Sequence, residues 1–129
     1  MSQGERFSAA ARAHSFRDAF RGVAVLLATQ HNARIHAVAT LAVLAVGFWL
    51  GCTRVEWAVL VLAIGLVWLA EGVNTALEAL GDAVSADPNP LVGRAKDVAA
   101  GAVLLASIGA AAAGLLIFVP RLLDRFAGG

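Results

Sequence analysis

Four polar side chains follow a long uncharged stretch of the chain and share one face of a predicted helix. The run Trp57–Ala70 holds no charged residue, and Glu71, Asn74, Glu78 and Asp82 come after it. Because an α-helix turns about 100° and rises about 1.5 Å per residue, the four lie in a stripe about 80° wide and about 16 Å long. Polar side chains in a helix apolar enough to span a membrane cost free energy, and such side chains usually mark a functional site.

A solvated helix face is the alternative explanation for these four residues. In that case the helix has already left the membrane at this point, and the side chains simply face water. A solvated face usually carries both signs of charge and includes lysine, whereas this stripe holds only acids and one amide. The composition of the stripe therefore favours a functional site.

The residue types in and near the stripe indicate phosphoryl transfer. Acids at the water edge of a membrane can hold Mg²⁺, which prefers oxygen ligands. Mg²⁺ together with a lysine is the usual equipment for phosphoryl transfer from a nucleotide, and Lys96 and Asp97 face the stripe from the next helix. Glu71 lies deepest, and a desolvated carboxylate can act as a base on a hydroxyl. The residues alone thus indicate a phosphotransferase that acts on a lipid.

Other classes of site find less support in the sequence. The chain has neither G-x-x-x-x-G-K-[ST] nor G-x-G-x-x-G, and its Ser, Thr, His and Asp residues lie at unrelated depths for a hydrolase triad. His31 and His36 are five residues apart, about 140° round a helix, so they do not converge on a metal. Cys52 is the only cysteine, which excludes an internal disulfide and a cysteine-rich metal site.

The composition predicts a small, single-domain membrane protein. Of the 129 residues 60% are hydrophobic and 15% are charged, far from the balance of a soluble domain. The net charge of +1 comes with scattered basic residues, so no nucleic-acid partner is expected.

We predict an all-α integral membrane fold with three transmembrane helices and an N-terminal amphipathic helix in the membrane interface. Phe16, Phe20, Val23 and Leu27 share one face of that first helix. The third span is rich in Ala and Gly, as at helix–helix interfaces, and is expected to stop at Pro120. The predicted segments of the single domain 1–129 are a polar tail 1–14, the amphipathic helix 15–29, and spans 33–51, 55–84 and 94–119.

The depth of the stripe and its side of the membrane follow from length and charge. The second helix has fourteen apolar residues before Glu71, about 21 Å. A hydrocarbon core of about 30 Å then ends near Ala76, so Glu71 lies just inside it, and Glu78 and Asp82 lie further toward water. Seven basic residues on the N-terminal side against three on the other predict a cytoplasmic N-terminus and a cytoplasmic stripe.

Two segments carry a resemblance to a known family. Glu71–Glu78 reads E-G-V-N-T-A-L-E, and Gly93–Leu104 reads G-R-A-K-D-V-A-A-G-A-V-L. With these motifs the chain resembles the prokaryotic diacylglycerol kinases, small three-span membrane enzymes, over about Phe16–Phe118. The resemblance implies an ATP- and Mg²⁺-dependent homotrimeric kinase that phosphorylates the primary hydroxyl of a membrane lipid alcohol. It also implies a multi-pass protein of the bacterial inner (cytoplasmic) membrane whose cytoplasmic active site feeds phospholipid or lipid-carrier metabolism.

The resemblance further implies a role for each matching residue. Glu71 is expected to be the base on the lipid hydroxyl, Asn74 to orient the reacting groups, and Glu78 to bind Mg²⁺ and the nucleotide. Lys96 and Asp97 are expected to contact ATP as part of the catalytic group. The residues expected near the nucleotide are Glu78, Asp82, Asp87, Asn89, Lys96 and Asp97.

Two departures from the family pattern bear on the metal and the lipid. Gln30 stands where the family usually has a metal-binding Glu; an amide oxygen can still bind Mg²⁺ but supplies no charge. Ala100, expected near the lipid with Glu71, stands where some diacylglycerol-specific members have Ser. The segments around His36, Trp57 and Lys96 look more like the undecaprenol kinase branch, so undecaprenol is favoured over diacylglycerol as the substrate.

Two other functions remain open at this stage. A small proton-coupled exporter could use Glu71 as its proton site, although Glu78, Asp82 and the Lys96–Asp97 pair would then have no role. A non-catalytic membrane scaffold is the third possibility. ATP-dependent labelling of a lipid extract by the purified protein separates the kinase from both.

Overall fold

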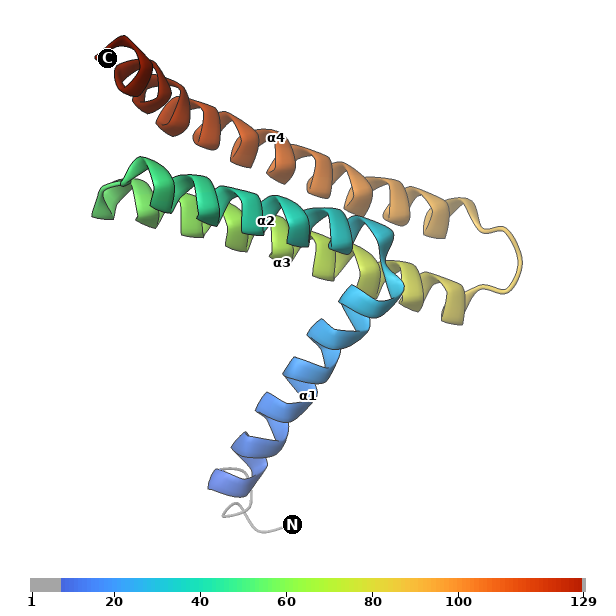
Figure 1. The fold of residues 1–129 in the computed structure, drawn as a ribbon. Helices are drawn as coiled ribbons and strands as arrows, with labels where there is room; N and C mark the ends of the chain where they lie inside the picture. The colour runs from blue at the N-terminus through green and yellow to red at the C-terminus, as the bar shows by residue number, and fades with distance from the viewer. Residues whose placement is uncertain (1–7, 129) are drawn as a thin grey trace.

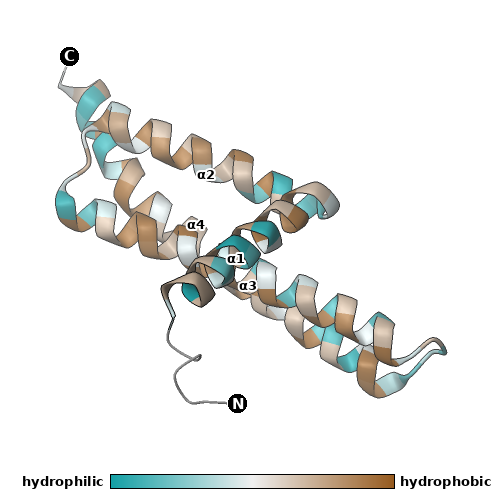
Figure 2. Ribbon diagram, turned by 90° about the horizontal axis from the view of Figure 1, so that it is seen from below, coloured by the Kyte–Doolittle hydropathy of each residue, from teal (hydrophilic) through white to brown (hydrophobic). Residues whose placement is uncertain are grey.

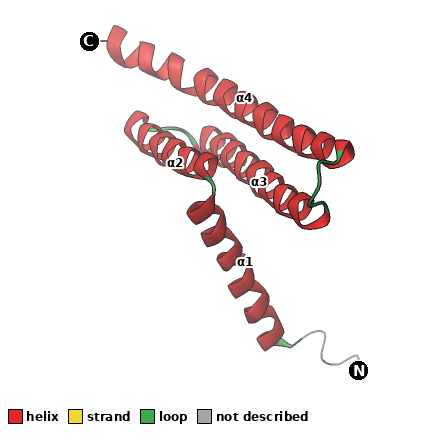
Figure 3. Ribbon diagram, turned by 90° about the vertical axis from the view of Figure 1, so that its right-hand side faces the viewer, coloured by secondary structure: helices red, strands yellow, loops and turns green. Residues whose placement is uncertain are grey.

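The computed structural model describes residues 8–128, which form four helices: α1 (Ala9–Thr29), α2 (His31–Leu50), α3 (Arg54–Val84) and α4 (Pro90–Ala127). Helices α2, α3 and α4 run side by side, and α1 leaves the bundle at an angle from the start of α2 (Figures 1 and 3). In this part of the chain α2, α3 and α4 are each long and apolar enough to cross a membrane. The predicted all-α fold with three candidate spans is therefore confirmed.

Helix α1 begins earlier than predicted. The hydroxyl of Ser8 accepts a hydrogen bond from the backbone N–H of Ala11 at 3.1 Å, so it caps the helix six residues before the expected start. Residues 9–14 of the predicted polar tail are thus helical. The side chains of Phe16, Phe20 and Val23 are exposed, as an interfacial helix would leave them, and the membrane-interface location of α1 stays a prediction.

A single extended residue separates α1 from α2. Gln30 has extended backbone angles (φ −102°, ψ 120°), which breaks the helical ladder. Arg34 holds the corner because its Nε donates to the Leu27 carbonyl at 3.1 Å and its second guanidinium nitrogen to that of Ala28. The gap between the predicted segments 15–29 and 33–51 is thus a sharp corner, and it places Gln30 at the edge of the bundle.

The α2–α3 connection is tight and is fixed by its turn residues. Gly51 adopts a left-handed conformation (φ 67°), which glycine accepts without strain. Thr53 and Glu56 then form a reciprocal capping box at the start of α3. Arg121 of α4 binds the same turn. Its guanidinium donates hydrogen bonds to both carboxylate oxygens of Glu56 and to the Leu50 and Gly51 carbonyls.

Helix α4 passes through Pro120 and ends at Ala127, so the prediction that Pro120 ends the helix was wrong. A proline inside a helix removes one backbone hydrogen bond and crowds the preceding turn. Arg121 follows directly, and its two hydrogen bonds to Glu56 join this part of α4 to the start of α3. Arg125, whose guanidinium lies 4.7 Å over the Trp49 ring, adds a second contact to α2.

Close packing is concentrated between α3 and α4, which form a long hairpin. The residues of these two helices that are buried include Leu60, Ala99, Val103 and Ala106, all small or branched. Large apolar side chains such as Leu62, Leu105 and Leu116 are exposed, and Figure 2 shows hydrophobic residues along the lengths of α2, α3 and α4. Outward apolar faces suit a surrounding of lipid or of further helices.

Candidate active site

Glu71 lies deepest in the polar stripe and is almost fully enclosed. Its side chain is 1% exposed, although α3 carries large exposed apolar residues on its other faces. Within residues 8–128 its Oε2 atom accepts no hydrogen bond. A buried polar atom without a partner costs free energy, so such an atom in a native fold calls for a ligand or a functional explanation.

A histidine of α2, His36, lies beside this carboxylate. Its Nε2 lies 3.6 Å from Oε2 of Glu71, and its own side chain is 17% exposed. Sequence reasoning missed this contact, because it compared His36 only with His31 and did not relate it to Glu71. The contact joins two helices, so no periodicity within one helix could reveal it.

Asn74 and Glu78 form the middle of the stripe, one helical turn apart. Asn74 is buried, and its Nδ2 donates to Oε1 of Glu78 at 3.3 Å. The amide oxygen of Asn74 accepts no hydrogen bond from any residue the structure describes. A carboxylate and an unengaged amide oxygen therefore lie together on one face of α3.

These two oxygens fit Mg²⁺, although they cannot enclose it. The described residues contain no group of three or more His, Cys, Asp or Glu side chains that could hold a metal ion. Mg²⁺ is commonly bound by one or two protein oxygens, with water and substrate phosphates completing its octahedron. Glu78 and Asn74 can supply such a partial set. Gln30 lies partly buried at the α1–α2 corner, where its Nε2 donates to Thr29 at 3.4 Å.

The far end of the stripe opens into a polar cavity of about 500 Å³ at the α3–α4 turn. Lys96 of α4 donates a hydrogen bond to Oδ1 of Asp82 across this hairpin. The cavity brings together residues from the end of α3, the loop and the start of α4, and four of the predicted nucleotide residues line it: Asp82, Asp87, Asn89 and Lys96.

Glycine permits the close approach of α3 and α4 at this cavity. A Cβ atom on Gly81 would lie 2.9 Å from Cε of Lys96 and 2.9 Å from a methyl carbon of Val92. Any larger residue at this position must push the lysine stem aside. Asn89 has a structural part as well, since its Oδ1 accepts from the backbone N–H groups of Leu91 and Val92 and caps α4.

Other predicted residues do not line this cavity. Glu78 lies earlier in α3, and Asp97 and Ala100 are exposed on α4. The structure thus gathers Asp82, Asp87, Asn89 and Lys96 into one place and pairs Asn74 with Glu78. The individual roles of these residues stay predictions.

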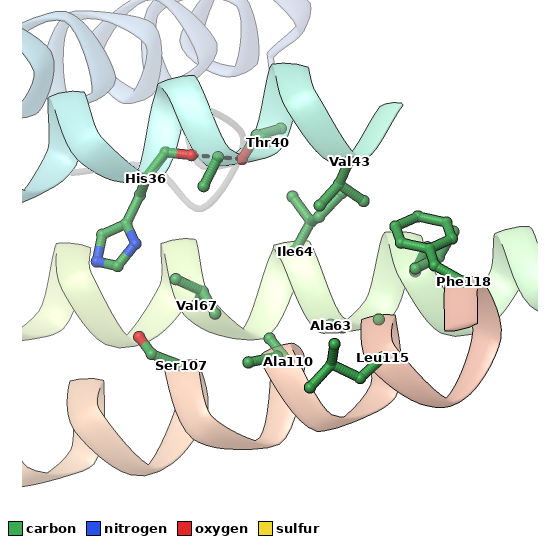
Figure 4. A pocket seen from close by; sticks show the side chains of 14 residues that line it. His36, Thr40, Val43, Ala63, Ile64, Val67, Ser107, Ala110, Leu115 and Phe118 are labelled. Carbon is green, nitrogen blue, oxygen red and sulfur yellow. Dashed lines mark hydrogen bonds between the residues drawn. The ribbon is translucent and has the colours of Figure 1, made fainter. Parts of the chain in front are cut away.

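A second cavity, of about 460 Å³, lies between α2, α3 and α4 and is mostly apolar (Figure 4). Val43, Leu60, Ile64 and other apolar residues form its walls, and His36 lines one end. Thr40 is the exception on the α2 wall: it donates to the His36 carbonyl at 2.7 Å and accepts from Nε1 of Trp68 at 3.0 Å. This apolar cavity, called the apolar groove below, therefore begins beside the Glu71–His36 contact.

Comparisons with known proteins place the chain in a family. Residues 17–118 match the family described as prokaryotic diacylglycerol kinase. The undecaprenol kinase of Bacillus subtilis (strain 168) is 40% identical over 108 residues, which are 84% of this chain and 88% of that protein. The diacylglycerol kinase of Synechocystis sp. (strain PCC 6803) is 44% identical over 111 residues, 85% of this chain and 63% of that protein.

A more distant relative shares a shorter segment. The diacylglycerol kinase of Escherichia coli (strain K12) is 35% identical over 75 residues, 58% of this chain and 62% of that protein. The family match covers both motifs of the stripe and the hairpin, and the similarity to the Bacillus protein spans most of both chains. The chain belongs to the prokaryotic diacylglycerol kinase family.

Proposed function

We propose that this protein is a membrane lipid kinase that transfers the γ-phosphate of ATP, with Mg²⁺, to the primary hydroxyl of a lipid alcohol. The observation that carries the proposal is the buried carboxylate oxygen of Glu71, which has no hydrogen-bond partner among residues 8–128 and lies on the same helix face as Glu78 and the cavity of Lys96. Glu71 lies among membrane-grade helices, whereas that cavity lies at the polar end of the hairpin. A lipid hydroxyl and a water-soluble nucleotide can therefore approach one helix face from two sides.

In the proposed reaction, Glu71 takes the proton of the lipid hydroxyl as the hydroxyl oxygen attacks the γ-phosphorus. The bond between that phosphorus and the β–γ bridging oxygen breaks, and ADP leaves. Asn74 holds the reacting groups in line, and the cationic Lys96 draws the nucleotide phosphates toward the hairpin. Bound by Glu78 and Asn74, Mg²⁺ would neutralise charge on the phosphates.

Undecaprenol is the substrate that we favour over diacylglycerol. The relative named undecaprenol kinase aligns over 88% of its own length, whereas the Synechocystis diacylglycerol kinase aligns over 63%. Ala100, where some diacylglycerol-specific members have Ser, agrees with this choice. We further propose a homotrimer in the bacterial inner membrane with the site on the cytoplasmic face. The many outward apolar side chains and the Ala- and Gly-rich α4 support helix contacts between subunits.

The test is phosphorylation of a lipid panel by the purified protein in phospholipid vesicles with γ-labelled ATP and Mg²⁺. Undecaprenol, a short polyprenol, diacylglycerol and no added lipid are compared, with Glu71→Gln as the matched negative control. We expect label in the polyprenols above that in diacylglycerol. If no lipid alcohol is labelled above the Glu71→Gln background, the kinase proposal fails. The exporter and scaffold alternatives gain no support, since the matched relatives carry kinase names.

A further inference from the structure

His36 of α2 lies beside Glu71, the proposed base, and has no role in the proposed reaction so far. Nε2 of His36 lies 3.6 Å from Oε2 of Glu71, beyond hydrogen-bonding distance, so the two side chains approach without bonding each other. Oε2 is buried and has no partner among the described residues. Polar atoms of two helices thus approach each other here without a hydrogen bond between them.

We propose that His36 binds the lipid hydroxyl together with Glu71, so that the substrate oxygen is held from two sides; this inference rests on the proposed kinase function. A hydroxyl is both a donor and an acceptor. Its hydrogen bonds Oε2 of Glu71, and its oxygen accepts from Nε2–H of His36. One group of the substrate therefore satisfies two protein atoms that do not satisfy each other.

The surroundings of His36 fit the place where a lipid hydroxyl meets its tail. His36 stands at the end of the apolar groove, and from there the groove runs along α2 to Val43, away from the corner with α1. Thr40, the next polar residue on that wall, already bonds Trp68 and the His36 carbonyl. In Figure 4 the imidazole of His36 points from α2 toward the α3 ribbon.

His36 keeps its proton through the reaction. The hydroxyl proton goes to Glu71, the new bond joins the substrate oxygen to the γ-phosphorus, and the ADP oxygen departs with the electron pair. The N–H of His36 occupies one lone pair of the substrate oxygen and leaves another directed at phosphorus. A site that engages a hydroxyl as donor and as acceptor also discriminates against analogues that lack it, because its buried polar atoms are then left unpaired.

The test uses two substitutions of nearly equal length and shape, His36→Gln, which keeps an N–H donor, and His36→Met, which has none. We expect His36→Met to lower kcat/KM for the lipid alcohol roughly 10- to 100-fold, the cost of leaving one buried acceptor without its donor. His36→Gln should retain most of the wild-type value. KM for ATP should stay unchanged in both. His31→Met, an exposed histidine on the same helix, is the matched control and should behave as wild type.

The outcomes separate the inference from the function on which it rests. If wild type phosphorylates no lipid alcohol, the kinase proposal itself fails. If wild type is active and the Gln and Met variants have equal kcat/KM for the lipid, His36 does not donate to the substrate and the inference is overturned. A loss of thermal stability or of detergent-extracted assembly in both variants would show a structural role instead and would also overturn it.

Discussion

Lys96 and Asp82, fourteen residues apart, bond each other across the α3–α4 hairpin and close one wall of the polar cavity. The bond depends on how closely the two helices approach, and Gly81 permits that approach, since a Cβ there would lie 2.9 Å from Cε of Lys96 and from Cγ1 of Val92. The lysine that the proposed mechanism needs for ATP is thus positioned by a glycine with no chemistry of its own.

Gly81→Ala should therefore weaken ATP binding. The added methyl group displaces the Lys96 stem, and overpacking of this kind costs about 1–3 kcal/mol of stability. Because a hydrogen bond to a charged group is worth about 1.5–3 kcal/mol, we expect KM for ATP to rise roughly tenfold or more. Steady-state kinetics with varied ATP give the measurement. Gly65→Ala on the same helix, where a Cβ meets nothing within 4 Å, is the control; equal KM values in the two variants would contradict the role of Gly81.

Glu71 and Glu78 should prove to have different tasks. They are seven residues apart on α3, about 10 Å along its axis, too far to touch one hydroxyl. Glu71→Gln removes the base and should lower turnover on the order of 10²–10⁴-fold while Mg²⁺–ATP binding survives. Glu78→Gln should weaken Mg²⁺–ATP binding along with turnover, because it removes an anionic ligand. The measurements are turnover and Mg²⁺–ATP affinity in both variants. If Glu71→Gln weakens nucleotide binding and Glu78→Gln does not, the two roles are the other way round.

Gln30→Glu should lower the Mg²⁺ concentration that gives half-maximal activity. A carboxylate at the α1–α2 corner adds the negative charge that the family usually has at this position. The measurement is activity against free Mg²⁺ at fixed ATP, with Gln30→Met to separate charge from side-chain size. An unchanged or higher Mg²⁺ requirement would mean that this chain binds its metal without position 30.

The pKa of the single native cysteine, Cys52, should depend on the charge of Glu56. Burial raises the pKa of the Cys52 thiol, the Glu56 carboxylate adds to the rise, and Arg121 opposes it. Removing the negative charge in Glu56→Gln makes the thiolate easier to form, so the pKa should fall. Alkylation by iodoacetamide, which needs the thiolate, should then reach its half-maximal rate at lower pH than in wild type. Asp18→Asn on α1 is the control; identical pH profiles for wild type and Glu56→Gln would refute the electrostatic account.

Opposite ends of α3 should lie on opposite sides of the membrane. Cys52 lies in the α2–α3 turn, whose carbonyls bond Arg121 of α4, whereas the α3–α4 loop lies at the other end of the hairpin (Figure 1). A membrane-impermeant maleimide applied outside intact cells should label Cys52, or Leu122→Cys in a Cys52→Ser chain. It should not label Ala86→Cys in the same chain. Labelling of positions 86 and 122 from one side would contradict the predicted topology.

The sequence by itself determined the helical spans, the polar stripe and the family. Helical spacing and apolar length are properties of consecutive residues, so the run before Glu71 and the stripe through Asp82 were visible without coordinates. The motifs around Asn74 and Lys96 carried the resemblance for the same reason.

Only the tertiary structure decided which groups meet across helices. The approach of His36 to Glu71 and the control of Lys96 by Gly81 depend on the register between separate helices, which pattern within one helix does not specify. The partner of Arg121 was likewise not visible in the sequence, since Arg121 follows Pro120 in α4 and bonds Glu56 at the opposite end of the bundle from the stripe. Local propensity predicted that the helix ends at Pro120, whereas α4 continues to Ala127.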